Sequence, residues 1–392
     1  MLTTPVWRVP GMPLLLTMTV LGFSGYAALL AVAPLWAVRG GADSVGAGLV
    51  NGVLMLFTVL TQLFVPRALR RFGWAPVLVT GMLLLGLPAL AHGLSDALAP
   101  TLALSAVRGL GFGVLTVTGS ALVAELVEPR RRGQAIGAYG LAIAVPQVLF
   151  LSAGPWVAER LGFWVVFAVA ALPALAAVPA VGLARRLDHV PEGDDERVPW
   201  ASLLPPMALL IGATLAGGAL ITFMAPMSSS AALTALALLV MSVAAAFARW
   251  RVGAWSDRHG PQRFLAPLVL LTTAGLAVIA WAVRDPQATV APALLAGAAV
   301  VGISYGGLQN LTLVVTFQAV SRQHYGPASA VWNIGFDAGT GAGAVVVGMV
   351  AAGTSFSTAL LVAGGISLLT LPLALGRAAR RTRAGGPPRG AG

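Results

Sequence analysis

The chain contains twelve apolar stretches that are each long enough to cross a lipid bilayer as a helix. A spanning helix needs roughly 20 apolar residues. With 58% hydrophobic residues, 9% charged residues and a mean hydropathy of +0.87, the chain is too apolar for a soluble globular protein. The sequence therefore predicts an all-α integral membrane protein. The expected spans are Met12–Val38, Gly46–Val65, Trp74–Leu94, Pro100–Ala124, Gly133–Ala158, Leu161–Ala184, Trp200–Met227, Ser228–Ala248, Phe264–Val283, Ala288–Val320, Gly326–Ala352 and Phe356–Leu375.

A short polar segment, residues 185–199, separates the first six stretches from the last six. It places five acidic residues among arginines and prolines and is too short and too polar to form anything but a linker. We therefore expect a six-helix bundle over residues 1–184, a cytoplasmic linker over 185–199, a second six-helix bundle over 200–376 and a basic cytoplasmic tail over 377–392.

The arginines lie on one side of the expected membrane. The net charge is +11 and no lysine is present; 20 of the 24 basic residues, Arg249 and Arg251 among them, fall in loops or tails on the side of the termini. Basic residues concentrate in cytoplasmic loops. This pattern predicts a multi-pass protein of the cell membrane with both termini in the cytoplasm, and it argues against nucleic-acid binding. Anionic lipid headgroups are expected neighbours of the basic tail.

The residues that build metal and catalytic sites are sparse. The chain has no cysteine, and its four histidines lie far apart in the sequence. An enzyme embedded in the membrane would need His, Asp, Glu or Ser side chains clustered near one face of the bilayer, and no such cluster is apparent. We expect no metal, no bound cofactor and no enzymatic activity.

A polar turn of eleven residues joins the eighth and ninth stretches, with the sequence Gly253-Ala-Trp-Ser-Asp-Arg-His-Gly-Pro-Gln-Arg263. Its glycines permit a tight backbone path. The shorter pattern Arg70-Arg-Phe-Gly73 occupies the same place in the first half, so the two halves repeat. The turn, the linker and the topology resemble the major facilitator superfamily of transporters. The resemblance implies two six-helix repeats that alternate access to a site near the middle of the membrane, and a monomeric protein that binds a small-molecule substrate.

The resemblance also implies a gating role for these turns. In such transporters the loop braces a helix of the opposite half, and Asp257 would cap the start of the fifth span near Gly133 and Gln134. The alternative is a solvated loop without a gating role. In the first half, Pro66 and Arg70 depart from the family pattern, which leaves the second copy as the intact one. The expected gating residues are Gly253, Asp257, Arg258, Gly260, Arg263, Arg70, Arg71, Gly73, Glu125 and Arg132.

Two charged residues are expected deep in the apolar spans, Arg108 and Asp337. A charge in the middle of a bilayer costs at least about 2.5 to 3.5 kcal/mol, so each should face a wet cavity or a partner. Asp337 is the leading protonation candidate, and the resemblance to proton-coupled exporters gives Arg108 a part in coupling. The alternatives are a structural carboxylate at position 337 and an arginine that extends to the membrane interface at position 108.

Polar and aromatic side chains on the expected cavity-lining and flanking helices are the substrate-binding candidates, although each alone is more often a helix-packing group. As a set they predict a mostly apolar cavity, which suits an amphipathic substrate better than a polyanion. The candidates are Tyr26, Asn51, Gln62, Gln147, Phe223, Tyr305, Gln309, Asn310 and Asn333.

Together these features favour a secondary transporter that exports small amphipathic compounds and is driven by the proton gradient. Uptake, or a sugar or metabolite permease, is the close alternative. A receptor or scaffold built on a transporter that no longer transports is the second alternative.

Overall fold

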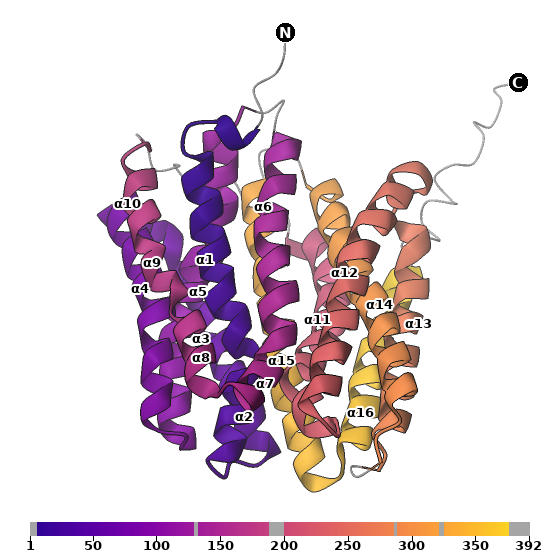
Figure 1. The fold of residues 1–392 in the computed structure, drawn as a ribbon. Coiled ribbons are helices and arrows are strands. Elements are labelled where there is room, and N and C mark those ends of the chain that lie inside the picture. The colour runs from indigo at the N-terminus through magenta and orange to yellow at the C-terminus, as the bar shows by residue number, and fades with distance from the viewer. Residues whose placement is uncertain (1–5, 129–131, 188–199, 286–287, 321–324, 376–392) are drawn as a thin grey trace, which may run out of the picture.

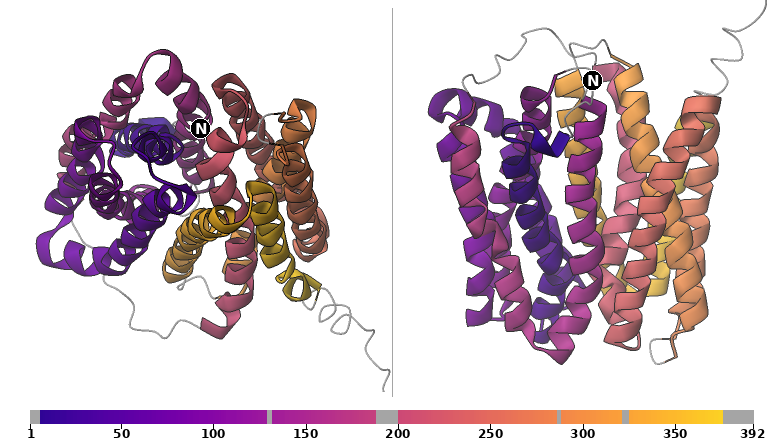
Figure 2. Two further views of the ribbon diagram at one scale, coloured as in Figure 1. Left: turned by 90° about the horizontal axis from the view of Figure 1, so that it is seen from below. Right: turned by 45° about the horizontal axis from the view of Figure 1, so that its top comes forward.

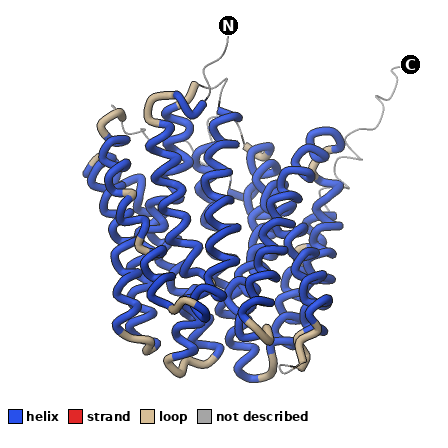
Figure 3. The backbone as a smooth tube through the Cα atoms, in the orientation of Figure 1, coloured by secondary structure: helices blue, strands red, loops and turns tan. Residues whose placement is uncertain are grey.

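The computed structural model describes residues 6–128, 132–187, 200–285, 288–320 and 325–375, and nearly all of them are helical (Figures 1 and 3). Twelve helical segments of these residues are long and apolar enough to cross a membrane, so the predicted all-α fold with twelve spans is confirmed. The elements are η1 (Val6–Arg8), α1 (Met12–Leu30), α2 (Val32–Arg39), α3 (Ser44–Phe72), α4 (Trp74–Ala91), η2 (His92–Leu94), α5 (Leu98–Leu126), α6 (Arg132–Pro146), the π-helical turn η4 (Gln147–Leu151), α7 (Ser152–Arg160), α8 (Phe163–Ala170), α9 (Leu172–Leu175), α10 (Ala177–Ala184), α11 (Trp200–Met227), α12 (Ala231–His259), α13 (Gln262–Ala282), α14 (Ala291–Gln318), α15 (Tyr325–Gly353) and α16 (Phe356–Leu368).

The helices form two groups that stand side by side. Figure 2 shows α1–α10 on one side and α11–α16 on the other. We call these groups the N half and the C half. The first described residues, at η1, and the last described residues, after α16, lie on the same side of the molecule (Figure 1), which we call the termini side; the other side, where α3 and α12 begin, is the far side.

The two halves repeat in their second spans, α3 and α12. Both helices are 29 residues long, and both begin at a side-chain cap, with Asp43 accepting from the N–H of Gly46 and Ser230 from the N–H of Leu233. Both end at a glycine with positive φ, Gly73 at 78° and Gly260 at 81°. Only glycine adopts this conformation without strain. The two helices therefore end in the same way. The predicted eleven-residue turn over 253–263 is wrong in extent, because α12 continues to His259 and α13 begins at Gln262.

The first span was predicted as one helix, but it is broken at Ala31 between α1 and α2. Pro34 is the cause, because proline has no N–H to donate to the carbonyl of residue 30. The freed Leu30 oxygen accepts a hydrogen bond from Asn51 Nδ2 on α3 at 2.8 Å. A backbone break within the membrane is tolerated when another group satisfies the carbonyl, as Asn51 does here.

The sixth span was also predicted as a single helix over 161–184, and the structure divides it into α8, α9 and α10. Pro173 at the start of α9 and Pro179 in α10 interrupt the regular bonding. The ring of Pro173 lies against Gly25 of α1, where a Cβ atom would overlap it. The irregular sixth span thereby packs closely on the first.

The halves meet mainly where the far-side part of α3 packs against the far-side part of α15. A Cβ atom at Gly48 would overlap the carbonyl oxygen of Ala344, and one at Gly348 would overlap that of Ser44. The Ser44 hydroxyl donates to the Gly348 carbonyl at 3.0 Å. Small residues let two helix backbones approach this closely. The two halves are therefore in direct contact on the far side.

Candidate functional site

The candidate site is centred on a hydrogen bond between the halves. Gln62 of α3 donates from Nε2 to Asp337 Oδ2 of α15 at 2.6 Å, and to the hydroxyl of Thr116 on α5 at 3.0 Å. Gln62 is 4% exposed and Asp337 is 3% exposed. A charge-assisted hydrogen bond in such a setting is worth roughly 1.5 to 3 kcal/mol. Asp337 is thus tied directly to the N half.

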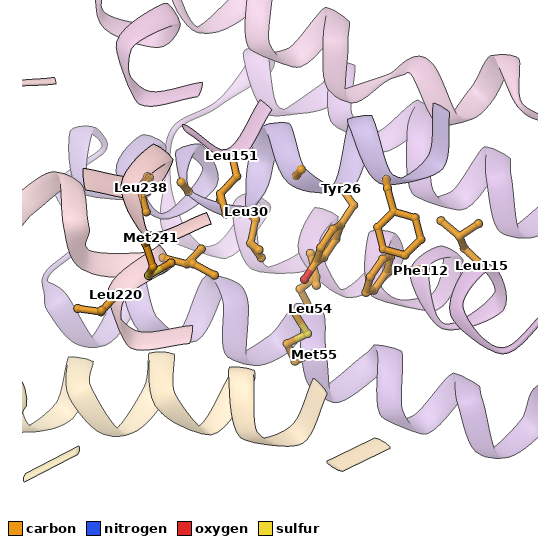
Figure 4. Close-up of a cluster of buried hydrophobic side chains, with 14 of the residues drawn as sticks. Tyr26, Leu30, Leu54, Met55, Phe112, Leu115, Leu151, Leu220, Leu238 and Met241 are labelled. Carbon is orange, nitrogen blue, oxygen red and sulfur yellow. The ribbon is translucent and has the colours of Figure 1, made fainter. Parts of the chain in front are cut away.

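Two tyrosines, one from each half, lie within electrostatic range of this carboxyl group, Tyr26 on α1 and Tyr305 on α14. The Tyr26 ring stacks on Phe112 of α5 with centroids 3.8 Å apart and planes 4° apart. Figure 4 shows the Tyr26 hydroxyl directed toward the side of α3 that carries Met55. Asp337 is therefore coupled electrostatically to one tyrosine of each half, in addition to its hydrogen bond with Gln62.

Arg108 lies inside the N half and is 0% exposed. Its Nη2 donates to the Gly25 carbonyl of α1 at 2.9 Å, and its Nε donates to the Leu85 carbonyl of α4 at 3.3 Å. It is within electrostatic range of Tyr26. The guanidinium thus joins α1, α4 and α5, and it reaches neither the membrane interface nor Asp337 by a direct bond. Its part in coupling remains a prediction.

Aromatic side chains of the C half form a surface next to Asp337. The ring centroid of Phe336 lies 6.2 Å from that of Tyr305 and 5.7 Å from that of Trp332. Trp332 donates from Nε1 to the Thr312 hydroxyl of α14 at 3.1 Å, which fixes the indole. The Tyr305 ring lies against Gly217 of α11, where a Cβ atom would overlap it. We call Tyr305, Trp332 and Phe336 the aromatic wall; all three are partly exposed.

Three other predicted substrate contacts use their amide groups in bonds to the backbone. Asn51 donates to the Leu30 carbonyl, as described above, and also to the hydroxyl of Thr222 on α11 at 2.9 Å. The second bond joins the two halves. Asn310 donates to the Arg249 carbonyl of α12 at 3.1 Å. Asn333 donates to the Ser329 carbonyl of its own helix at 3.0 Å.

The last three predicted contacts lie apart from one another. Phe223 is 0% exposed, and its ring is in contact range of both Gly48 and Gly348 on the far side. Gln309 is buried on α14, and Gln147 is half-buried in the π-helical turn η4. Of the predicted contacts, the structure therefore bonds Gln62 to Asp337, leaves Tyr26 and Tyr305 within electrostatic range of it, and places Phe223 in the contact between the halves.

The predicted gating residues gather on the termini side. Gly253 packs against the amide of Asn310, and the Arg71 guanidinium lies 5.4 Å from the Phe72 ring centroid. Arg70, Glu125, Arg258 and Arg263 are exposed. The side chains of Asp257, Arg132 and Gln134 lie outside the described residues, so the predicted cap on the fifth span stays a prediction.

A cavity of about 430 Å³ lies on the far side between the halves, away from Asp337. Arg39 and Glu159 of the N half line it together with Ser228 to Ser230 of the C half. Neither Gln62 nor Asp337 contributes to its surface. It is a far-side indentation rather than the central site.

Replacing Asn51 by leucine is expected to destabilise the protein by roughly 1 to 3 kcal/mol, because the Leu30 carbonyl would be buried without a partner. Thermal unfolding in detergent, followed by tryptophan fluorescence, measures the effect. Asn333→Leu is the matched control, since its amide bonds only within its own helix. A midpoint for Asn51→Leu equal to that of Asn333→Leu would contradict this role.

Comparison with known proteins identifies the family. The family model of the Major Facilitator Superfamily matches residues 14–283 and 207–391. A curated relative, the probable 4-methylmuconolactone transporter of Cupriavidus pinatubonensis (strain JMP 134 / LMG 1197), is 33% identical over 111 residues, which are 27% of this chain and 26% of the relative. The match thus spans about a quarter of that relative.

Solved structures share the fold at low sequence identity. A crystal structure of a bacterial homologue of the human lysosomal transporter Spinster, inward-facing and occupied, matches with a TM-score of 0.72 and 14% identity over 95% of this chain and 97% of that one. A mutant of the nucleoside transporter NupG matches with a TM-score of 0.69 and 13% identity over 93% and 99%. Since the family model covers nearly the whole sequence and the described residues contain twelve helices long and apolar enough to span a membrane, the chain belongs to the Major Facilitator Superfamily of transporters.

Proposed function

We propose that this chain is a proton-coupled permease that carries a small amphipathic compound across the cell membrane by alternating access. Asp337 is the group that takes up and releases the proton. The observation that supports this proposal is the hydrogen bond between Asp337 and Gln62, which joins the two halves at a buried carboxyl group. Ionisable groups inside a membrane protein mark proton and substrate pathways more often than they serve packing.

Protonation changes the bond that holds the halves together. The ionised carboxylate accepts a charge-assisted hydrogen bond from Gln62, whereas the neutral acid accepts a weaker one. Binding a proton therefore loosens the link between α3 and α15. A substrate that binds only the protonated form would move together with the proton, because each shifts the same equilibrium between conformations.

The conformation fits this cycle if the termini are cytoplasmic, as the arginine distribution predicts. The far side is then the outer side, and α3 and α15 are in contact there. The contact on the far side would then close the outer side of the molecule, and a proton on Asp337 would leave toward the cytoplasm once the termini side opens. The gating turns on the termini side would make their contacts in the opposite state.

We propose uptake as the direction, in place of the export favoured from the loop motifs. The described residues of those motifs lie at the helix ends on the termini side, and none of them forms a hydrogen bond with Gln62 or Asp337. The named relatives act, by their descriptions, on a muconolactone and on nucleosides. These are metabolites rather than drugs, which favours uptake or a general permease.

The test is transport by the purified protein in liposomes with an imposed pH gradient. The panel contains small organic acids, their neutral amides, nucleosides and lipophilic cations. We expect at least one compound to accumulate under the gradient and a protonophore to abolish the accumulation. Proton coupling would be contradicted if a panel compound is transported and its accumulation changes with neither the pH gradient nor the protonophore.

A further inference from the structure

A second charged side chain belongs to the same region, Arg249 on α12. The sequence pattern groups it with the arginines of the inner loops. In the structure it lies within the spanning part of α12, which runs from Ala231 to Gly253, and its side chain is exposed. The α14 helix packs along this part of α12, since a Cβ atom at Gly306 would overlap the Ala245 carbonyl and Asn310 bonds the Arg249 carbonyl.

Arg249 leaves α12 on the same side as Ala245, four residues earlier, which is the side that packs against α14. It lies within electrostatic range of the Tyr305 phenol, and Tyr305 in turn lies within range of Asp337. Because the Tyr305 ring rests against Gly217 of α11, it occupies the side of α14 that faces the interior of the C half. Tyr305 is therefore coupled electrostatically both to Arg249 and to Asp337.

Arg251, two residues further along, has a different environment. Its guanidinium lies 5.6 Å from the ring centroid of Trp250 and 5.2 Å from that of Trp255, and both indoles are exposed. Residues two apart lie about 200° apart around a helix, so the two arginines leave α12 on nearly opposite sides. Arg251 belongs to the outer surface of the C half, and Arg249 belongs to the side next to α14.

Among the described residues Arg249 forms no ion pair with an acidic side chain, and Tyr305 is the group to which it is coupled electrostatically. The only acidic residue of α12 is Asp257. It is eight positions away, which corresponds to about 12 Å along the helix axis and exceeds the reach of the side chain. An arginine at membrane depth without a carboxylate partner is suited to bind an anion. Its planar guanidinium group can donate two parallel hydrogen bonds to the two oxygens of a carboxylate.

We propose that Arg249 binds the carboxylate of the substrate, and that the substrate is a small organic monoanion with a planar apolar body that lies on the aromatic wall. This inference rests on the proposed function and names its substrate class. Tyr305, Trp332 and Phe336 supply the apolar contact, and Asp337 carries the proton. One anion and one proton then move together without net charge, which removes the cost of carrying an unpaired charge through the protein.

The test measures binding separately from transport. Phenylacetate, cinnamate and 4-hydroxybenzoate are compared with their neutral amides by the shift in thermal unfolding of the purified protein. We expect at least one acid to bind more tightly than its amide, and Arg249→Gln to weaken that acid at least about tenfold while leaving the amide unchanged. Arg249→Lys should restore part of the affinity, because it keeps the positive charge.

Arg251→Gln is the matched control, since it removes the same charge two residues away on the outer surface and should bind as the wild type does. Equal weakening by both variants, or equal binding of every acid and its amide by the wild type, would overturn the proposal. If the amides accumulate under the pH gradient and Arg249→Gln does not change the binding of any acid, the proposed substrate class is wrong and the proton-coupled permease stands. If acid binding depends on Arg249 but no compound responds to the gradient, the permease proposal fails instead.

Discussion

Asp337→Asn is expected to abolish accumulation driven by a pH gradient while leaving exchange of substrate across the membrane intact. Asparagine has nearly the shape of a protonated aspartate and still offers an oxygen to Gln62 Nε2, but it cannot gain or lose a proton. A gradient of one pH unit corresponds to about 1.4 kcal/mol and sustains about tenfold accumulation when one proton accompanies each substrate. The variant should reach only about equal concentrations inside and outside.

Two liposome measurements separate these outcomes. Accumulation under a gradient reports coupling, and exchange of labelled against unlabelled substrate at equal pH reports the movement of the halves. Glu159→Gln is the control, because it makes the same acid-to-amide change at an exposed position on the far side. Full accumulation by Asp337→Asn would show that the carboxyl group is structural.

Gly48→Leu is expected to prevent the far side from closing and so to stop transport. The new side chain would meet the backbone carbonyl of Ala344, which cannot move aside as a side chain could. Overpacking of this kind costs roughly 1 to 3 kcal/mol. That cost reduces the closed population roughly 5- to 150-fold. The molecule should then rest with α3 and α15 apart on the far side.

The distance between spin labels on the far side measures this opening. The chain has no cysteine, so Ala97→Cys and Thr354→Cys supply the only labelling sites. Both positions are exposed, and they lie in opposite halves. We expect a longer distance in Gly48→Leu than in the labelled parent. Gly140→Leu is the control, because a Cβ atom at that glycine meets nothing within 4 Å. An unchanged distance in Gly48→Leu would refute the role of this contact.

The twelve spans could be predicted because the length of an apolar stretch determines whether it can cross a bilayer, and this property is local in the sequence. The helix ends at Gly73 and Gly260 were not predicted, because the spans were expected to end at Val65 and Ala248 and the helices continue through polar residues to Phe72 and His259. Asp337 was identified because an acidic residue in an apolar span needs an explanation. The predictions of the spans and of Asp337 depend on neighbouring residues alone.

The partners of these residues could not be predicted, because they depend on packing between distant segments. Asn51 looked like a substrate contact, but Pro34 frees the Leu30 carbonyl and the amide satisfies it. Gln62 and Asp337 are 275 positions apart, and no pattern in one sequence pairs them. Arg249 was grouped with the loop arginines because the sequence alone does not locate the position at which α12 leaves the membrane to within one helical turn.

The central claim is that Asp337 gains and loses a proton during the transport cycle. Infrared difference spectroscopy across a pH change tests it most directly, because a protonated carboxyl group has its own C=O stretching band. The account predicts a carboxyl band in the wild-type difference spectrum that is missing in Asp337→Asn and retained in Glu159→Gln. Identical spectra for the wild type and Asp337→Asn would contradict it.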